Sequence, residues 1–276
     1  MPRRLLSASP TRLLTFLDCP RRYRMTYLDR PPPQKGPPWA HNSLGAAVHT
    51  ALANWWKLPV ERRTPAAAGA LLESGWLSDG FRNDAQSYAH RDRAREMVVR
   101  YVAELDPADE PVGVERVVSV MTEHAAFSGR VDRIDDRASE GLVIVDYKTG
   151  RHLLTVDDAR TSLALAVYAV ASARTLRRPS HRVELHHLPS GEVLAWEHTD
   201  ETLARHVRRA DSLSVDVVSA EAAFREGLPP DEVDKWFPPQ PSRICGWCDF
   251  NRVCPEGNAA QAPFDPWSGL ADEQSD

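Results

Sequence analysis

The residues best placed to do chemistry end the segment GLVIVDYKTG, residues 141–150. Four aliphatic residues, 142–145, run directly into Asp146, Tyr147 and Lys148. Side chains alternate between the two faces of a β-strand, so Asp146 and Lys148 would share one face, about 7 Å apart. A buried strand has no packing reason to end in two charges. The strand either leaves the core with an ordinary ion pair at the surface, or it presents both charges to a ligand.

A further acid lies in the preceding segment, SGRVDRIDD. Residues 135–141 predict a hairpin loop, which would set Asp132 beside Asp146 on neighbouring antiparallel strands. Two converging carboxylates can hold Mg²⁺ or Mn²⁺ through oxygen ligands. The cation would polarise a phosphoryl oxygen and acidify a bound water, and Lys148 would position that water and stabilise developing charge. From these three residues alone, the metal-dependent site and a surface hairpin with an ion pair remain open alternatives.

The surrounding pattern predicts the elements that must position these residues. Ser9 and Pro10 mark a helix start, followed by a helix that ends near Cys19. Helical spacing recurs in several later segments, whereas 30–43 is a proline-rich loop. These helical segments are 45–56, two or three helices within 60–105, 156–176 and 201–226. Three short β-branched segments lie between Val112 and Gly150, and a further hairpin spans 181–198. The pattern predicts one α/β domain.

Together these motifs resemble the PD-(D/E)XK nuclease superfamily, and within it the RecB-like branch. GRVDRID and DYKTG match the family's second and third motifs, and His49 in LGAAVHTAL matches the histidine of the first. The resemblance implies that His49, Asp132, Asp146 and the backbone carbonyl of Tyr147 bind the metal, with Lys148 as the catalytic lysine. From the residues alone, His49 would more commonly be a packed core histidine.

Two other positions bear on the resemblance. The family usually carries Gln-x-x-x-Tyr on the next helix, where this chain has Tyr168 but Ala164 in place of the glutamine. Tyr168 would still contact DNA, while the missing glutamine puts substrate positioning in doubt. Glu115 lies where the family often has an acid, and is either a supporting carboxylate or a surface residue of a strand.

All four cysteines fall at two places, Cys19 and the C-x2-C-x5-C cluster Cys245, Cys248 and Cys254. In a reducing compartment this spacing disfavours structural disulfides and suits Zn²⁺ or an iron–sulfur cluster. The arrangement resembles the iron–sulfur staple of RecB-like nucleases, which implies a [4Fe–4S] cluster, with Zn²⁺ as the alternative. Arg21 and Arg22 beside Cys19 would then meet nucleic-acid phosphates.

Composition and charge set the remaining expectations. The 276 residues carry a net charge of −5, yet residues 1–24 hold six arginines against one acid. This asymmetry suits either a basic patch or a solvated helix. Without a sustained apolar leader or span, we expect a cytoplasmic protein. A nuclease domain is predicted over 1–258, with a helical elaboration at 57–110, a cysteine-rich module at 236–258, and a disordered acidic tail at 259–276.

The resemblance implies a restriction-endonuclease-like core in which a central mixed sheet is flanked by helices. It also implies an exonuclease acting on single-stranded DNA ends in repair, recombination or processing, with a helicase or CRISPR adaptation proteins as candidate partners. Two rivals remain. One is a catalytically weakened iron–sulfur module that only grips DNA or a helicase, and the other is a zinc-bound adaptor with an incidental DYK sequence.

Overall fold

A computed structural model describes residues 5–270, which form two compact units. The first unit comprises Ser119–Gly129, Glu201–Asp265 and the described part of Met1–Pro37. The second unit comprises Pro38–Val118, Arg130–Asp200 and the described part of Pro266–Asp276. Each unit is thus assembled from segments that are far apart in the sequence.

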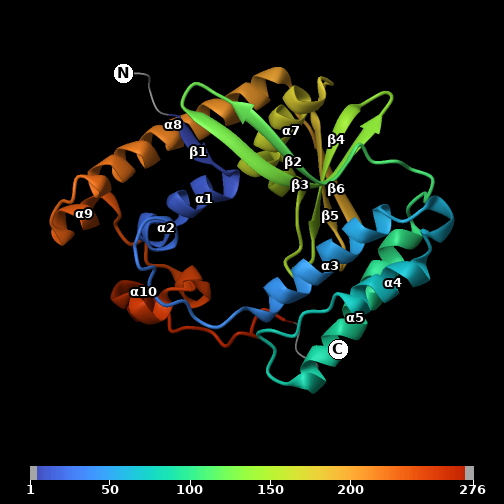
Figure 1. The fold of residues 1–276 in the computed structure, drawn as a ribbon, viewed down its shortest axis with the longest axis horizontal. Coiled ribbons are helices and arrows are strands. Elements are labelled where there is room, and N and C mark those ends of the chain that lie inside the picture. The colour runs from blue at the N-terminus through green and yellow to red at the C-terminus, as the bar shows by residue number, and fades with distance from the viewer. Residues whose placement is uncertain (1–4, 271–276) are drawn as a thin grey trace. The chain divides into compact units, whose positions relative to one another are not determined.

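The second unit is built on a mixed β-sheet (Figure 1). Its strands are β2 (Gly113–Met121), β3 (Ala125–Arg137), β4 (Gly141–Lys148), β5 (Arg182–His187) and β6 (Glu192–Glu197). The order is β3-β4-β5-β6, with β2 paired to β3. The β3–β4 and β5–β6 pairs are antiparallel, whereas β4 and β5 are parallel. The strands β2 and β3 begin or end in the first unit, where β1 (Leu6–Ala8) pairs in parallel with the start of β3.

Helices cover both faces of this sheet in the second unit. They are α3 (Ala40–Trp56), η1 (Val60–Arg62), α4 (Pro65–Ser74), α5 (Asp84–Ala103), α6 (Val156–Thr161) and α7 (Leu163–Leu176). Val143, Val145 and Tyr147 of β4 pack into one core cluster with α3, α4 and α5. The alternate β4 residues Leu142 and Ile144 are also buried, and α7 contacts β4. The α/β architecture with a central mixed sheet flanked by helices is therefore confirmed.

The first unit is mainly helical. Its helices are α1 (Pro10–Asp18), α2 (Pro20–Tyr27), α8 (Asp200–Arg225), α9 (Pro230–Trp236), η2 (Arg243–Trp247), η3 (Asn251–Val253) and α10 (Pro255–Ala260). Ser9 caps α1 as predicted, since its hydroxyl accepts a hydrogen bond from the Arg12 backbone N–H at 3.2 Å. The cysteine-rich segment holds more regular structure than its proline content indicated, in the form of three short helices.

Two predicted boundaries are wrong. The helix α3 begins at Ala40, inside the predicted loop 30–43, because the last proline of that run is Pro38 and nothing after it prevents helix formation. The loop between β3 and β4 is shorter than expected, because residues 135–137 still pair with 141–143. Both predicted loops were therefore too long, because regular structure extends further into the turn-like segments than their composition indicated.

The last described residues, 266–270, are held within the second unit by backbone carbonyls. The Ala40 backbone N–H donates to the Pro266 carbonyl, and the Arg151 guanidinium donates to the Leu270 carbonyl. Of the tail predicted over 259–276, residues 271–276 lie outside the described residues.

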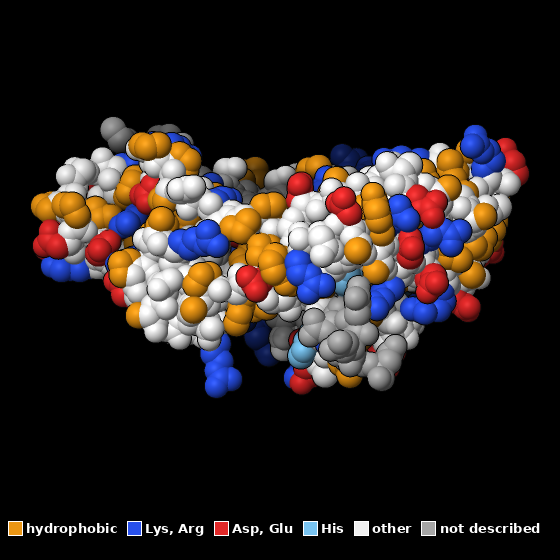
Figure 2. Space-filling view, turned by 90° about the horizontal axis from the view of Figure 1, so that it is seen from below, with side chains coloured by type: hydrophobic (Ala, Val, Ile, Leu, Met, Phe, Trp, Pro, Cys, Tyr) orange, Lys and Arg blue, Asp and Glu red, His pale blue; other side chains and the backbone are white. Residues whose placement is uncertain are grey.

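On the face shown in Figure 2, basic and acidic side chains are interspersed. Among the described residues, no helix is both long and apolar enough to cross a membrane.

Candidate active site

The strands β3 and β4 bring the two predicted carboxylates together. Arg133 pairs with Val145, so the next position in this antiparallel register sets Asp132 opposite Asp146. Asp132 Oδ2 accepts a hydrogen bond of 2.9 Å from the backbone N–H of Tyr147. The carboxylate of Asp132 is thereby fixed against the strand that carries Asp146.

Asp146 and Lys148 form an ion pair at the end of β4. Lys148 Nζ lies 2.7 Å from Asp146 Oδ2, and 45% of the lysine side chain is exposed. Burial raises the pKa of Asp146, while the charge of Lys148 opposes that rise and the charge of Asp132 adds to it. Burial and the charge of Asp132 both disfavour the ionised form of Asp146, so a cation bound nearby would stabilise that form.

His49 projects from α3 towards the same carboxylates. Its Nδ1 lies 3.3 Å from Asp132 Oδ1, and its ring makes an edge contact with Tyr147. Burial alone would lower the pKa of His49, but the hydrogen bond and charge of Asp132 raise it overall. The helix α3 holds this position because Val48 and Leu52 on its inner side are fully buried in the core cluster.

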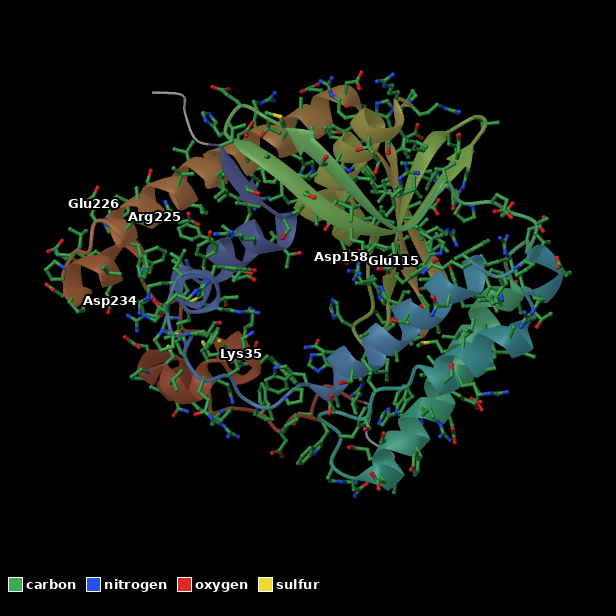
Figure 3. All side chains as sticks on the ribbon, in the orientation of Figure 1. Lys35, Glu115, Asp158, Arg225, Glu226 and Asp234 are labelled. Atoms are coloured by element: carbon green, nitrogen blue, oxygen red, sulfur yellow. The ribbon has the colours of Figure 1, made fainter. Side chains whose placement is uncertain are left out.

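Glu115 joins His49 and Asp132 in one group of candidate ligands, although the sequence marked it only as a possible supporting carboxylate. Ligand atoms of His49, Glu115 and Asp132 all lie within 4.8 Å of one another. Glu115 lies on β2, where Figure 3 labels it, and adopts a φ of 49°. A non-glycine residue in this left-handed conformation is uncommon and is often found at functional sites. The sequence indicated Glu115 only as an acid within a β-branched segment, at a position where the family often has one.

These side chains suit a divalent cation. The donor set combines an imidazole with carboxylate oxygens. Carboxylate oxygens are typical ligands of Mg²⁺ and Mn²⁺, whereas imidazole nitrogen is more typical of transition metals. Arg130 Nε lies 2.6 Å from Glu115 Oε2, so one carboxylate of the group is already partly neutralised. A ligating imidazole must be neutral, so metal binding at His49 would release the proton that Asp132 stabilises.

His187 holds the end of β4, a role that the sequence did not reveal. Its ring is buried, and Nε2 lies 2.8 Å from the Gly150 carbonyl while Nδ1 lies 2.7 Å from Ser190 Oγ. The carbonyl can only accept, so Nε2 carries a proton and donates a hydrogen bond to the Gly150 carbonyl. The residues after Lys148 are thus tied to the next strand of the sheet.

Tyr168 and Ala164 lie one turn apart on α7, the helix that packs against β4 and β5. Both are partly buried. The glutamine expected at position 164 is replaced by a methyl group, so this turn of α7 offers no amide to a ligand. Contact between Tyr168 and DNA stays a prediction.

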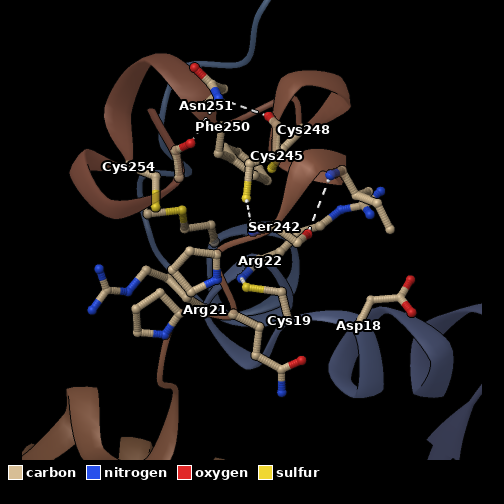
Figure 4. Close-up of a pocket in the computed structure, with 16 residues that line it drawn as sticks. Asp18, Cys19, Arg21, Arg22, Ser242, Cys245, Cys248, Phe250, Asn251 and Cys254 are labelled. Atoms are coloured by element: carbon tan, nitrogen blue, oxygen red, sulfur yellow. Dashed lines mark hydrogen bonds between the residues drawn. The ribbon is translucent and has the colours of Figure 1, made fainter. Parts of the chain in front are cut away.

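The four cysteines of the first unit line one pocket (Figure 4). Burial raises the pKa of the Cys248 thiol, and the nearby Cys19 contributes to the rise. A Cβ on Gly257 would lie 3.3 Å from Cys254 Sγ and 3.6 Å from Cys245 Sγ, so a larger residue here would crowd the two sulfurs. Backbone N–H groups of Arg22 and Ser242 donate to the sulfurs of Cys19 and Cys245.

The arginines beside Cys19 differ in their surroundings. Arg21 is buried, with Nη1 2.7 Å from Glu256 and Nη2 3.2 Å from Asp234. Two carboxylates thus already neutralise the guanidinium that was expected to meet phosphate. Both Arg21 and Arg22 line the cysteine pocket. Phosphate binding by either arginine stays a prediction.

Comparisons with known proteins add an independent observation. The family model described as the PD-(D/E)XK nuclease superfamily matches residues 7–255 of this chain. Among solved structures, the chain is similar to a protein of Eubacterium rectale provisionally described as an exonuclease. The identity is 12%, 91% of this chain and 89% of that chain are covered, and the TM-score is 0.46. A search of curated proteins finds no match.

Proposed function

Because this chain belongs to the PD-(D/E)XK nuclease superfamily, we propose that it is a Mg²⁺- or Mn²⁺-dependent deoxyribonuclease of the RecB-like branch. In this proposal it acts as an exonuclease on single-stranded DNA ends. The observation that carries the proposal is the convergence of His49, Glu115 and Asp132 within 4.8 Å, with the Asp146–Lys148 pair on the adjacent strand.

The roles proposed for the residues combine the resemblance to the superfamily with the convergence of His49, Glu115 and Asp132. His49, Asp132, Asp146 and the Tyr147 carbonyl would hold the cation, with Glu115 as a supporting carboxylate. A divalent cation bound there would polarise the phosphoryl oxygen and acidify a water. Lys148, anchored by Asp146 yet partly exposed, orients the attacking water and offsets the charge that develops on the phosphate.

Activity and metal binding are tested separately. We expect the purified protein to shorten end-labelled single-stranded DNA only with Mg²⁺ or Mn²⁺, and Lys148→Ala to lower the rate by about 10²- to 10⁴-fold. Lys148→Ala should still bind Mn²⁺ in calorimetry, whereas Glu115→Gln should bind it about tenfold more weakly. The control is Glu201→Gln, which neutralises a carboxylate that is 81% exposed. Cleavage without metal, or unchanged by Lys148→Ala, would overturn the proposal.

The proposal includes a [4Fe–4S] cluster on Cys19, Cys245, Cys248 and Cys254. It is supported by the shared pocket and by the glycine that keeps it open. The alternative is Zn²⁺, which four thiolates also suit. A colourless anaerobic preparation containing one zinc would refute this assignment.

Ala164 favours one alternative, a catalytically weakened iron–sulfur module that binds DNA or a helicase. It predicts DNA binding and a visible spectrum without metal-dependent cleavage. The biological setting remains part of the proposal: a cytoplasmic enzyme of DNA repair, recombination or processing, working beside a helicase or CRISPR adaptation proteins. Cleavage assays on linear and circular single strands would separate exonuclease from endonuclease action.

A further inference from the structure

A second pocket in the second unit adjoins the candidate active site. Thr149, Gly150 and Arg151, which directly follow the candidate catalytic lysine, line one side of it. Gly45 of α3 lines both this pocket and the cleft that contains His49 and Glu115. A Cβ on Gly45 would lie 3.3 Å from Thr149 Oγ1, so α3 passes close to the end of β4 between the two spaces.

The side chains of this pocket suit an anion. Its polar lining includes Arg93 and Arg151, together with His41 on α3 and His90 on α5. None of the lining residues among those described is acidic, although the chain as a whole carries a net charge of −5. The rest of the lining is apolar or small, so an anion there would meet little competing negative charge.

The position of the pocket relates it to the scissile phosphate. Thr149, directly after Lys148, lines this pocket, and Gly45 lines both the pocket and the cleft that contains His49. A DNA strand with its scissile phosphate at the candidate cation site would therefore carry a neighbouring phosphate to this pocket. We infer that this pocket, defined by Arg93, Arg151, His41, His90 and Thr149, binds a backbone phosphate of the substrate next to the one that is cleaved. The inference rests on the proposed nuclease function and extends it to a specific phosphate-binding subsite.

Arg93 offers the sharpest test because it is exposed and lies on α5, away from the candidate metal ligands. Binding of a labelled single-stranded oligonucleotide would be measured by anisotropy in EDTA, across a range of KCl concentrations. We expect Arg93→Gln to bind roughly three- to tenfold more weakly at low salt. The slope of log affinity against log salt should fall by about 0.7, the value for one phosphate contact on a single strand. Arg91→Gln is the matched control, since Arg91 lies on the same helix and pairs with Asp92 outside the pocket.

Different DNA ends distinguish a terminal from an internal phosphate. If the pocket takes a terminal phosphate, wild type will prefer 5′-phosphorylated over 5′-hydroxyl oligonucleotides, and Arg93→Gln will lose the preference. If it takes an internal phosphate, Arg93→Gln will weaken linear and circular strands equally. Either result supports the pocket, whereas equal affinity and salt slope for Arg93→Gln and Arg91→Gln would overturn it. These binding measurements need no cleavage, so the two proposals can fail separately. If only the nuclease proposal is wrong, the protein will not cleave DNA with or without metal, but its DNA binding will still depend on Arg93.

Discussion

At the scale of single residues, a buried polar network supports the strand that carries the candidate site. The Arg133 guanidinium donates to the Tyr101 hydroxyl at 3.2 Å and to the Tyr147 hydroxyl at 3.5 Å. Tyr101 in turn bonds His186 Nδ1 at 2.8 Å, and His186 Nε2 lies 2.9 Å from Glu184. Tyr147 stands between Asp146 and Lys148 in sequence, so this network fixes the strand from the face opposite the two charges.

Glu184 anchors the network and makes stability depend on pH. Burial alone would raise the pKa of this 2%-exposed carboxylate, but hydrogen bonds from His186, Arg137 and Arg182 lower it overall. A lowered pKa in the folded state means that the stabilisation is complete above about pH 5 and declines as the pH falls below about 4.3. We expect Glu184→Gln to cost about 3 kcal/mol of unfolding free energy at pH 7, measured by urea denaturation.

The difference between wild type and Glu184→Gln should shrink as the pH falls, because protonated Glu184 resembles the amide. The matched control is Glu140→Gln. Glu140 also forms ion pairs with Arg137 and Arg182, but 37% of its side chain is exposed. It should cost less than about 1 kcal/mol. A pH-independent difference between wild type and Glu184→Gln would show that the carboxylate charge is not the source of the stabilisation.

At the scale of elements, the end of β4 is held by its neighbour β5. The Leu188 backbone N–H donates to the Lys148 carbonyl at 2.9 Å, and His187 reaches past it to the Gly150 carbonyl. The strand that carries the candidate catalytic lysine is therefore fixed on both sides, by the register with β3 and by these bonds. Precise placement of Lys148 needs such support, because small displacements of catalytic groups are costly.

We expect His187→Ala to lower kcat/KM of the proposed nuclease about tenfold or more, because it loosens the segment after Lys148, including Gly150 at the edge of the proposed phosphate pocket. His187→Gln, whose amide can still donate to the Gly150 carbonyl, should restore most of the rate. Steady-state kinetics with a melting curve for each variant would separate positioning from folding. Equal losses in both variants, in proportion to their melting temperatures, would mean that His187 serves stability alone.

At the scale of the whole molecule, the sequence was enough to predict which side chains share a face of a strand. It was not enough to predict side-chain contacts between segments that are far apart in the chain. The alternation in residues 141–148 was enough to place Asp146 and Lys148 on one face, opposite the tyrosine. The pairing of Asp132 with Asp146 also followed from the order of the two segments. Local patterns could not reveal that Arg21 pairs with Glu256, 235 positions later, or that His187 bonds Gly150, because these contacts exist only after the chain has folded.

The first unit depends on joining the two ends of the sequence, which the cysteines would do. Cys19 lies on the N-terminal segment, and the other three cysteines follow 226 or more positions later. If all four hold one cluster, Cys19→Ser should abolish the visible absorbance and lower the melting temperature by about 10 °C, since the cluster contributes several kcal/mol to folding. Arg21→Gln is the control, because it removes two ion pairs between the same two segments, with Asp234 and Glu256. Since the Arg21 guanidinium is buried, this variant should cost about 1 to 3 kcal/mol while keeping the visible absorbance. Equal shifts in the two variants, with the absorbance of Cys19→Ser retained, would exclude Cys19 as a ligand and leave ordinary side-chain contacts to join the segments.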